Sequence, residues 1–193
     1  MTALRAAITD FRPDCEQERA DRALMLRCLD TFDNLLTREN PIAHFTASAW
    51  VVSRDGRQVL MAYHNIYRSW SWTGGHADGE ADLAAVALRE VREETGLHAL
   101  QPVLTRPLSL EILGVPPHVR RGAFVSAHLH LNLTYLFTAD STAPLRVKPD
   151  ENSAVAWFPA GEAADRSTEP EMQIVYRKLI GKTTAIFAQE APQ

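Results

Sequence analysis

Three carboxylates, Glu90, Glu93 and Glu94, stand three and four positions apart in a helix-forming run that ends at Gly96. On an α-helix, residues at this spacing lie on one face, so the three side chains point the same way. Like charges at this spacing repel, and a hard divalent cation such as Mg²⁺ or Mn²⁺, which prefers oxygen ligands, offsets that repulsion. The alternative is a solvated, salt-bridged helix face, because Arg89 precedes Glu93 by four positions and can pair with it.

The residues before this helix decide between the two interpretations. Gly75 is followed, fourteen positions later, by Arg-Glu-Val-Arg-Glu-Glu-Thr-Gly-Leu over residues 89–97. This pattern resembles the box of the Nudix hydrolases, which reads Gly, five residues, Glu, seven residues, then Arg-Glu-aliphatic-x-Glu-Glu-x-Gly-aliphatic. One position departs, because Ala81 stands where the box has an isolated Glu. A one-residue shift of the loop would let either neighbour, Glu80 or Asp82, take that role.

The fold that this resemblance implies agrees with the order of elements that the sequence predicts. Strands are expected before and after one central helix, and a further helix is expected near the end of the chain. The resemblance implies an α+β fold, a Nudix-type α/β/α sandwich with a central mixed sheet, over residues 41–190. Residues 1–40 lie outside it and are expected to form an N-terminal helical extension. That extension either covers the sheet or makes the contact of a possible homodimer.

Hydrophobic periodicity, turn residues and prolines place the individual elements. Helices are expected over 14–36 and 170–189, the second with a capping box formed by Thr168 and Glu171. Strands are expected over 47–53 and 58–64 as a hairpin, 101–113 as an extended segment, 124–138 as the longest strand, and 154–158.

Nudix enzymes cleave a nucleoside diphosphate linked to another group, by attack of water on phosphorus. The resemblance therefore implies a pyrophosphohydrolase that acts on a small nucleotide-like diphosphate, with Mg²⁺ or Mn²⁺ as cofactor. A diphosphate is negatively charged and repels a nucleophile, so metal ions are needed to neutralise its oxygens and to activate water. The metal ligands implied by the resemblance are the carbonyl oxygen of Gly74 and the carboxylates of Glu90, Glu93 and Glu94, with Arg89 as a catalytic residue beside them.

A general base is expected either on the box helix or in a loop after the longest strand. Glu151, in the loop Pro-Asp-Glu-Asn over 149–152, is the first candidate, and Glu90 is the second. The alternative is that Glu151 is an exposed turn residue, since Pro, Asp and Asn all favour turns.

The loop before the glycine pair is rich in aromatic side chains that suit a flat group. Tyr67, Trp70 and Trp72 are predicted to stack on a base or similar ring of the substrate. Arg68, which lies among them, is predicted to meet a phosphate. Packing of these aromatic residues in the hydrophobic core is the alternative.

His128 and His130 are two positions apart in an expected strand, so they share one face of it. They are predicted to bind the substrate, and inward-facing histidines with ordinary hydrogen bonds are the alternative. Arg120 and Arg121, beside Gly122, form a small basic spot that contacts phosphate or is a solvated turn.

Length, charge and cysteine content bound the class of protein. At 193 residues and 46% hydrophobic content, the chain suits one domain with an extension. A net charge of -4 argues against a nucleic-acid polymer as partner. No long apolar segment or signal peptide is recognised, so no membrane association is expected. Cys15 and Cys28 are 13 positions apart in one expected helix and cannot bridge, which favours reduced thiols and a cytoplasmic protein.

Two rival functions belong to other classes. Isopentenyl diphosphate isomerases share the Nudix fold but use an active-site cysteine, and both cysteines here precede the domain. A nucleotide-sensing module that has lost catalysis usually loses box carboxylates, which this sequence keeps. The particular diphosphate is left open, because the coenzyme A signature is absent and Pro116 lies later than the proline of ADP-ribose enzymes. An oxidised nucleoside triphosphate or a nucleotide sugar is compatible with the sequence.

Overall fold

The chain folds around one central sheet with helices on both faces. The computed structural model describes residues 1–120 and 122–190, so Arg121 of the predicted basic spot, like the side chain of Arg120, lies outside the described part. The helices are α1 (Thr2–Asp10), α2 (Glu16–Thr31), α3 (Leu83–Thr95), α4 (Ala160–Arg166) and α5 (Pro170–Glu190). The strands are β1 (Ala43–Ser53), β2 (Gln58–His64), β3 (Ser69–Ser71), β4 (Thr73–His76), β5 (Gln101–Pro102), β6 (Ser109–Val115), β7 (His118–Arg120), β8 (Ala123–Val125), β9 (His128–Ala139) and β10 (Asn152–Pro159).

The centre of the sheet is the parallel pair of β1 and β9, in register from Ala43 opposite Leu129 to Ser53 opposite Ala139. The strand order is β10-β2-β1-β9-β5, with β3 on β2, β4 on β1 and β6 on β9. All of these other pairs are antiparallel. Because the sheet holds both kinds of pair, the prediction of a mixed sheet is confirmed.

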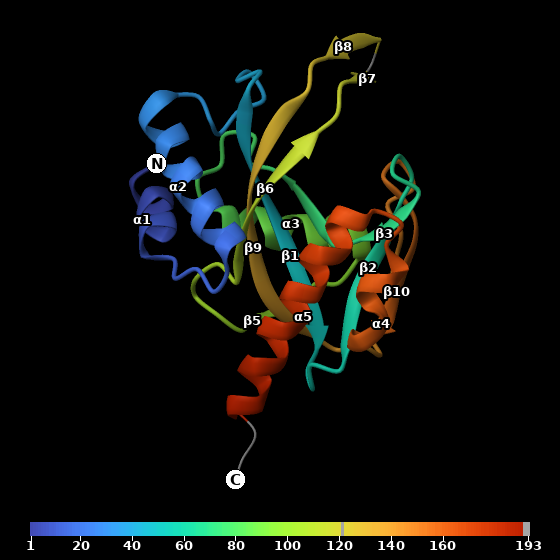
Figure 1. Cartoon of the computed structure of the whole chain (residues 1–193). Coiled ribbons are helices and arrows are strands. Elements are labelled where there is room, and N and C mark those ends of the chain that lie inside the picture. Colours follow the sequence, from blue (N-terminus) through green and yellow to red (C-terminus); the bar gives the residue numbers. More distant parts are fainter. Residues whose placement is uncertain (121, 191–193) are drawn as a thin grey trace.

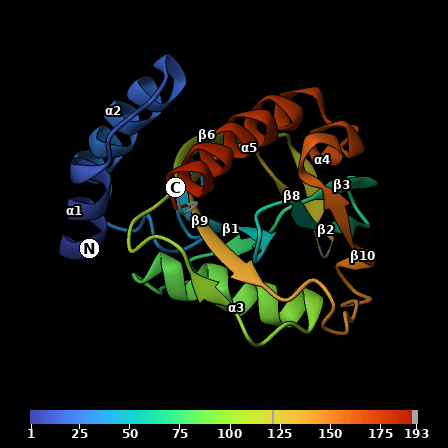
Figure 2. The ribbon, with the colours of Figure 1, turned by 90° about the horizontal axis from the view of Figure 1, so that it is seen from below.

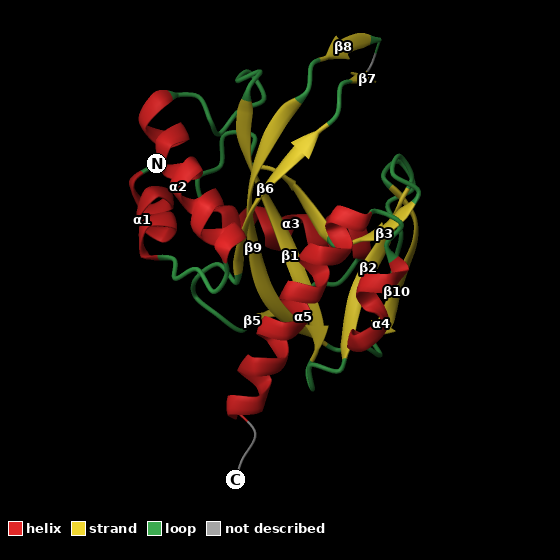
Figure 3. Ribbon diagram, viewed as in Figure 1, coloured by secondary structure: helices red, strands yellow, loops and turns green. Residues whose placement is uncertain are grey.

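Helices cover both faces of this sheet (Figures 1, 2 and 3). Strand β1 is buried along its whole length, and its alternate side chains enter two different cores. Phe45 belongs to the core that includes Val86 and Val91 of α3. Trp50 points to the other face and stacks on Tyr176 of α5, with ring centroids 5.6 Å apart. The predicted α+β sandwich is therefore confirmed.

Helices α1 and α2 flank the sheet beside β6 (Figures 1 and 2). Their buried residues Leu4, Ile8 and Met25 join the same core as Phe45. This packing is what a covering role for the N-terminal extension requires. The alternative of a dimer contact and the boundary at residue 40 stay predictions.

A buried ionic network attaches α2 to the rest of the fold. Glu18 is fully buried, and its carboxylate accepts a hydrogen bond of 2.6 Å from Ser109 Oγ of β6. Lys182 and Lys178 of α5 approach the same carboxylate at 2.9 and 3.5 Å. Lys178 also pairs with the buried Glu111 of β6 at 2.9 Å. A buried carboxylate is tolerated only with such partners, so three elements are held in one arrangement.

The single helix predicted over 14–36 was wrong at both ends. Cys15 is the residue before α2, and the helix stops at Thr31 because Phe32 takes an extended backbone conformation. The chain must then reach β1, and the backbone N–H of Phe45 donates to the carbonyl of Leu35 at 2.7 Å. The periodic Leu35 is buried, but in a connecting segment and not in a helix.

The strand predicted over 124–138 divides into two. Strand β6 pairs with β9 only as far as Val115 opposite His128. Pro116 and Pro117 follow and lack a backbone N–H, so they cannot continue the ladder. The segment beyond them forms a separate β7–β8 hairpin that projects from the sheet (Figure 1). Helices α1 and α4 were not predicted, and no helix in the described residues is long and apolar enough to cross a membrane.

Candidate active site

Helix α3 carries the box carboxylates, and its two ends are capped locally. The Asp82 side chain accepts a hydrogen bond from the Ala85 backbone N–H at 3.1 Å. Gly96 ends the helix in the left-handed conformation, with φ of 74°. Glu80 accepts from the Asp82 backbone N–H at 2.8 Å. Both neighbours of Ala81 thus make local loop contacts, and whether either replaces the missing box Glu stays open.

The glycine pair of β4 lies directly against this helix. The Gly74 backbone N–H donates to Glu94 Oε1 at 3.0 Å. A Cβ atom at Gly75 would lie 2.5 Å from Cδ of Glu90, and one at Gly74 would lie 2.7 Å from the Ala47 carbonyl oxygen. Real Cβ atoms do not approach this closely. Glycine at position 75 therefore leaves room for the Glu90 carboxylate, and glycine at position 74 lets β4 lie close to the backbone of β1.

Substituting Gly75→Ala is therefore expected to displace Glu90 and to lower Mg²⁺ affinity and hydrolysis by about 10-fold or more, the scale of disturbed support around a metal site. The matched control is Gly114→Ala, because a Cβ at Gly114 meets no described atom within 4 Å. Isothermal titration with Mg²⁺ and a phosphate-release assay measure the two effects. Equal behaviour of the two variants would contradict this account of Gly75.

Three carboxylates converge beside the glycine pair. The carboxylate oxygens of Glu90, Glu94 and Glu151 lie within 4.8 Å of one another. Glu151 comes from the loop before β10, and Asn65 holds this loop in place. The backbone N–H of Asn65 donates to the Glu151 carbonyl at 3.0 Å, and the Asn65 side chain donates to the Pro149 carbonyl at 3.1 Å. The loop predicted to supply a general base therefore reaches the box helix.

Burial raises the pKa of the Glu94 carboxyl to about 8, and the neighbouring charges of Glu90 and Glu151 act in the same direction. Burial also raises the pKa of Glu90, and the Arg89 guanidinium opposes this shift. Such a cluster of oxygen donors holds protons when no cation is bound and releases them to one. The donor type, the convergence and the glycine contact all fit a hard divalent cation.

Glu93, the other predicted ligand, does not join these three in the described structure. Its carboxylate lies 3.3 Å from Lys148 Nζ and 3.9 Å from Arg89 Nε. Arg89 makes its closer contact with Glu90, at 3.1 Å. Lys148 also contacts Glu151 at 2.9 Å, so one ammonium group links the two carboxylates. The metal-ligand role of Glu93 and of the Gly74 carbonyl stays a prediction.

Sequence reasoning missed Lys148. Its only local signal is its position three residues before Glu151, which is an ordinary arrangement for a turn. The contact with Glu93 depends on the docking of the loop on α3, which no local pattern encodes. The ion pairs raise the pKa of Lys148 although partial burial opposes them, so this side chain stays cationic at the site.

The two tryptophans predicted to bind substrate have aromatic neighbours within the fold. Trp70 lies edge-on to Phe158, with ring centroids 4.7 Å apart, and Trp72 lies edge-on to Tyr176 at 5.5 Å. Both pack against the core under α5. These contacts correspond to the packing alternative, and the substrate role of the tryptophans stays a prediction.

Tyr67 and Arg68 lie closer to solvent. Tyr67 is 51% exposed and its ring packs on His64, with centroids 4.5 Å apart. Arg68 has a positive φ of 51°, which is uncommon for a residue other than glycine. Its backbone N–H donates to the His64 carbonyl at 2.8 Å and closes the turn. The predicted contacts of Tyr67 and Arg68 with substrate are untested.

His128 and His130 lie beside two histidines that sequence reasoning did not group with them. Their own ring centroids are 5.2 Å apart. His44 of β1 lies 4.9 Å from His128 and 5.0 Å from His130, and His76 of β4 lies 4.7 Å from His130. The register of β1 with β9 and β4 brings them together, and that register cannot be obtained from local patterns. The substrate role predicted for His128 and His130 stays a prediction.

Comparison with known proteins assigns the class of protein that this fold and site define. The family model described as NUDIX domain matches residues 43–179. The chain belongs to the Nudix family.

A curated relative, the RNA pyrophosphohydrolase of Sphingopyxis alaskensis, is 26% identical over 140 residues, covering 69% of this chain and 88% of the relative. At the level of enzyme class, the prediction of a Nudix pyrophosphohydrolase is confirmed.

Solved structures share the fold. A Nudix hydrolase from M. smegmatis, RenU, has a TM-score of 0.56 and 18% identity, covering 74% of this chain and 87% of its own. An Ap4A hydrolase from C. elegans has a TM-score of 0.52 and 16% identity, covering 75% and 98%. The dihydroneopterin triphosphate pyrophosphohydrolase of E. coli has a TM-score of 0.53 and 16% identity, covering 70% and 94%. At these identities the likeness concerns the fold alone.

Proposed function

We propose that this Nudix enzyme hydrolyses a pyrophosphate bond in a small nucleoside-diphosphate-linked substrate, with Mg²⁺ or Mn²⁺ held by its carboxylate cluster. The observation that carries the proposal is the convergence of Glu90, Glu94 and Glu151 within 4.8 Å. Two of these residues belong to the box helix and one to a distant loop. Repulsion among the three makes such a cluster costly without protons or a cation.

In this proposal each residue of the site has a role. A bound divalent cation would supply charge neutralisation for the diphosphate and activation of the attacking water. Glu90 and Glu94 would hold this cation, and Glu151 would accept the proton of the attacking water, with Glu90 as the alternative base. Arg89 orients Glu90 through its 3.1 Å hydrogen bond, and Lys148 orients Glu151 at 2.9 Å. Catalysis then rests on positioning and electrostatics, as phosphoryl transfer requires.

Several observations weigh against the rival functions. The isomerase reading needs a cysteine at the site, whereas Cys28 is buried in α2 and Cys15 stands just before that helix. A sensor that has lost catalysis is expected to lack box carboxylates, whereas Glu90 and Glu94 are present and converge with Glu151.

The test is a phosphate-release screen of the 193-residue protein with Mg²⁺ or Mn²⁺. Its panel contains nucleotide sugars, an oxidised nucleoside triphosphate, dinucleoside polyphosphates and RNA with a 5′-triphosphate, each read with inorganic pyrophosphatase or phosphatase as coupling enzyme. We expect hydrolysis of at least one small diphosphate and its loss in EDTA. The RNA arm covers the activity named for the relative from S. alaskensis, and the net charge of -4 predicts no release from it.

Failure of the whole panel would favour the sensor, and hydrolysis that persists in EDTA would exclude the metal-dependent reaction. The same assay identifies the base. Glu151→Gln is expected to lower kcat by about 100-fold and to remove one limb of the pH profile. An unchanged profile in that variant, with the limb lost in Glu90→Gln, would transfer the role to Glu90.

A further inference from the structure

The side chains of four histidines, His44, His76, His128 and His130, form one cluster. They lie on the same face of the sheet as Trp50, which contacts α5. His44 and His130 are direct partners in the parallel pairing of β1 and β9. His76 is the partner of Thr46, two positions along β1, so its side chain lies on the same face as that of His44. His128 starts β9, and its ring centroid lies 4.9 Å from that of His44.

We propose that His44, His76 and His130 form a transition-metal site, one that binds an ion of the Zn²⁺ type and is separate from the carboxylate cluster. Each of these three side chains offers one ring nitrogen, and the three nitrogens lie within 4.8 Å of one another. Tetrahedral Zn²⁺ with bonds of about 2.0–2.1 Å holds its ligand nitrogens about 3.4 Å apart. Rotation of the rings is needed to bring the nitrogens to that separation, and imidazole binds such ions more readily than it binds Mg²⁺.

His44 and His130 each have one ring nitrogen that could serve an ion. His44 is 5% exposed, and its Nδ1 lies 3.3 Å from the Asn40 carbonyl oxygen. Its Nε2 is buried and has no hydrogen-bond partner among the described residues. The Nε2 of His130 is likewise buried, and none of the residues that the structure describes pairs with it. A backbone carbonyl that fixes one ring nitrogen while the other stays available is the usual arrangement around metal-binding histidines. Unpaired buried nitrogens are otherwise costly.

The surroundings of His130 and His44 disfavour protonation of their rings. Burial lowers the pKa of His130 to about 2, and the neighbouring imidazoles of His76, His44 and His128 act in the same direction. Burial also lowers the pKa of His44. The neutral imidazole is the form that binds metal, and the convergence of the three ring nitrogens places the ligand atoms together.

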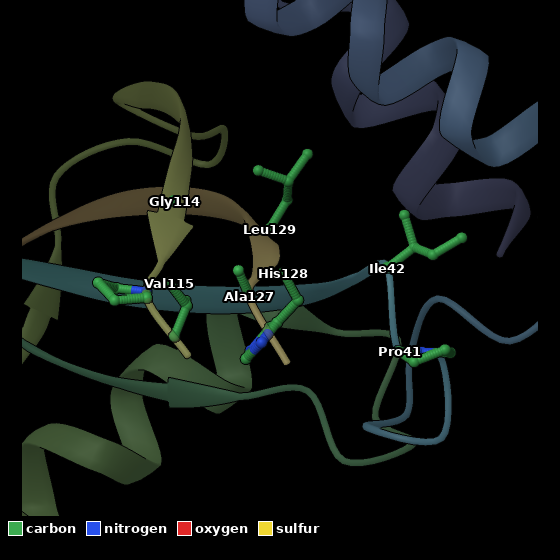
Figure 4. Close-up of a pocket in the computed structure, with 8 residues that line it drawn as sticks. Pro41, Ile42, Gly114, Val115, Ala127, His128 and Leu129 are labelled. Atoms are coloured by element: carbon green, nitrogen blue, oxygen red, sulfur yellow. The ribbon is translucent and has the colours of Figure 1, made fainter. Parts of the chain in front are cut away.

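The surroundings of the cluster separate it from the acidic site. A groove of about 530 Å³ adjoins it, lined by His128 together with Ile42, Val115 and Leu129 (Figure 4). The acidic site lies toward α3, since a Cβ at Gly75 would meet Glu90. His76 follows Gly75 in the same strand and therefore points to the opposite face.

The experiment is metal binding to the EDTA-treated full-length protein, with Zn²⁺ measured by equilibrium dialysis and Co²⁺ by visible absorption. We expect one equivalent of bound Zn²⁺ and an intense tetrahedral Co²⁺ band, both retained in Glu94→Gln. His130→Asn and His76→Asn are each expected to weaken Zn²⁺ binding by about 100-fold. His76 is half-buried. His98→Asn is the matched control, because His98 is exposed and far along the chain from the cluster.

Three results would overturn the proposal. One is the absence of tight Zn²⁺ binding in a protein whose circular dichroism shows it to be folded. Another is binding that survives both His130→Asn and His76→Asn but is lost in Glu94→Gln, which would assign the ion to the acidic cluster. The third is a higher KM in His130→Asn with no transition metal bound in the wild type, which would assign His130 to substrate binding.

Discussion

Glu94→Gln is expected to lower Mg²⁺-dependent kcat/KM by about 100-fold or more, while the protein stays folded. Loss of the groups that support a metal ligand lowers activity by about 10–100-fold. Loss of a charged ligand itself is therefore expected to lower activity by at least the upper end of that range. Glutamine keeps the size of the side chain and an oxygen that can accept from Gly74, which limits the structural effect. Glu162→Gln is the matched control, since this exposed residue pairs with Arg166 on α4.

The pH dependence of metal binding gives the same variant a second readout. With no metal bound, burial holds the pKa of Glu94 at about 8, so the carboxyl is largely protonated at neutral pH. Mg²⁺ must displace that proton, and its apparent affinity is therefore expected to rise as pH rises toward 8 and then to level off. In Glu94→Gln this dependence should flatten. Unchanged kcat/KM together with an unchanged affinity profile would remove Glu94 from the site.

Glu18→Ala is expected to lower the free energy of unfolding by about 3–5 kcal/mol, the usual result of breaking a buried ion pair from one side. The substitution leaves Lys182 and Lys178 beside an empty space at the contact of α2, β6 and α5. It also removes the acceptor of the Ser109 hydroxyl. Urea denaturation followed by circular dichroism measures the change.

The control for this prediction is Asp30→Ala, which breaks the exposed pair of Arg5 and Asp30 between α1 and α2. Exposed pairs of this kind contribute about 0–1 kcal/mol. A loss in Glu18→Ala no larger than in Asp30→Ala would show that α2 is attached chiefly by its apolar residues and not by the ionic network.

Features encoded over short stretches of sequence were predicted well. The box helix, its glycine cap at Gly96 and the hairpin of β1 and β2 all depend on neighbouring residues, and the structure contains them. Glu151 was predicted as a general base from its residue type and its place in a loop. Such a base must lie near the box helix, and Glu151 does lie near Glu90. Its role as a base is not decided by position alone.

Features that depend on long-range register were not predictable. The contact of Lys148 with Glu93 needs the last loop to dock on α3, and the meeting of His44 with His130 needs the parallel pairing of β1 and β9. The burial of Glu18 needs two lysines from α5, at the other end of the chain. A sequence pattern reports which face a residue occupies, but the partner opposite that face is set by topology.

The parallel pairing of β1 and β9 also constrains how the chain reaches its native state. Every residue of β1 pairs with β9, and α3 and β6 intervene between the two strands in the chain. Closing so long a loop costs conformational entropy before the central contacts form, which slows folding. During synthesis, the buried and largely apolar β1 must wait for β9 to leave the ribosome, so its edge is open to wrong partners in that interval. Strands β2 and β4, which follow β1 in the chain, pair along one of its edges, and the other edge depends on the speed of translation.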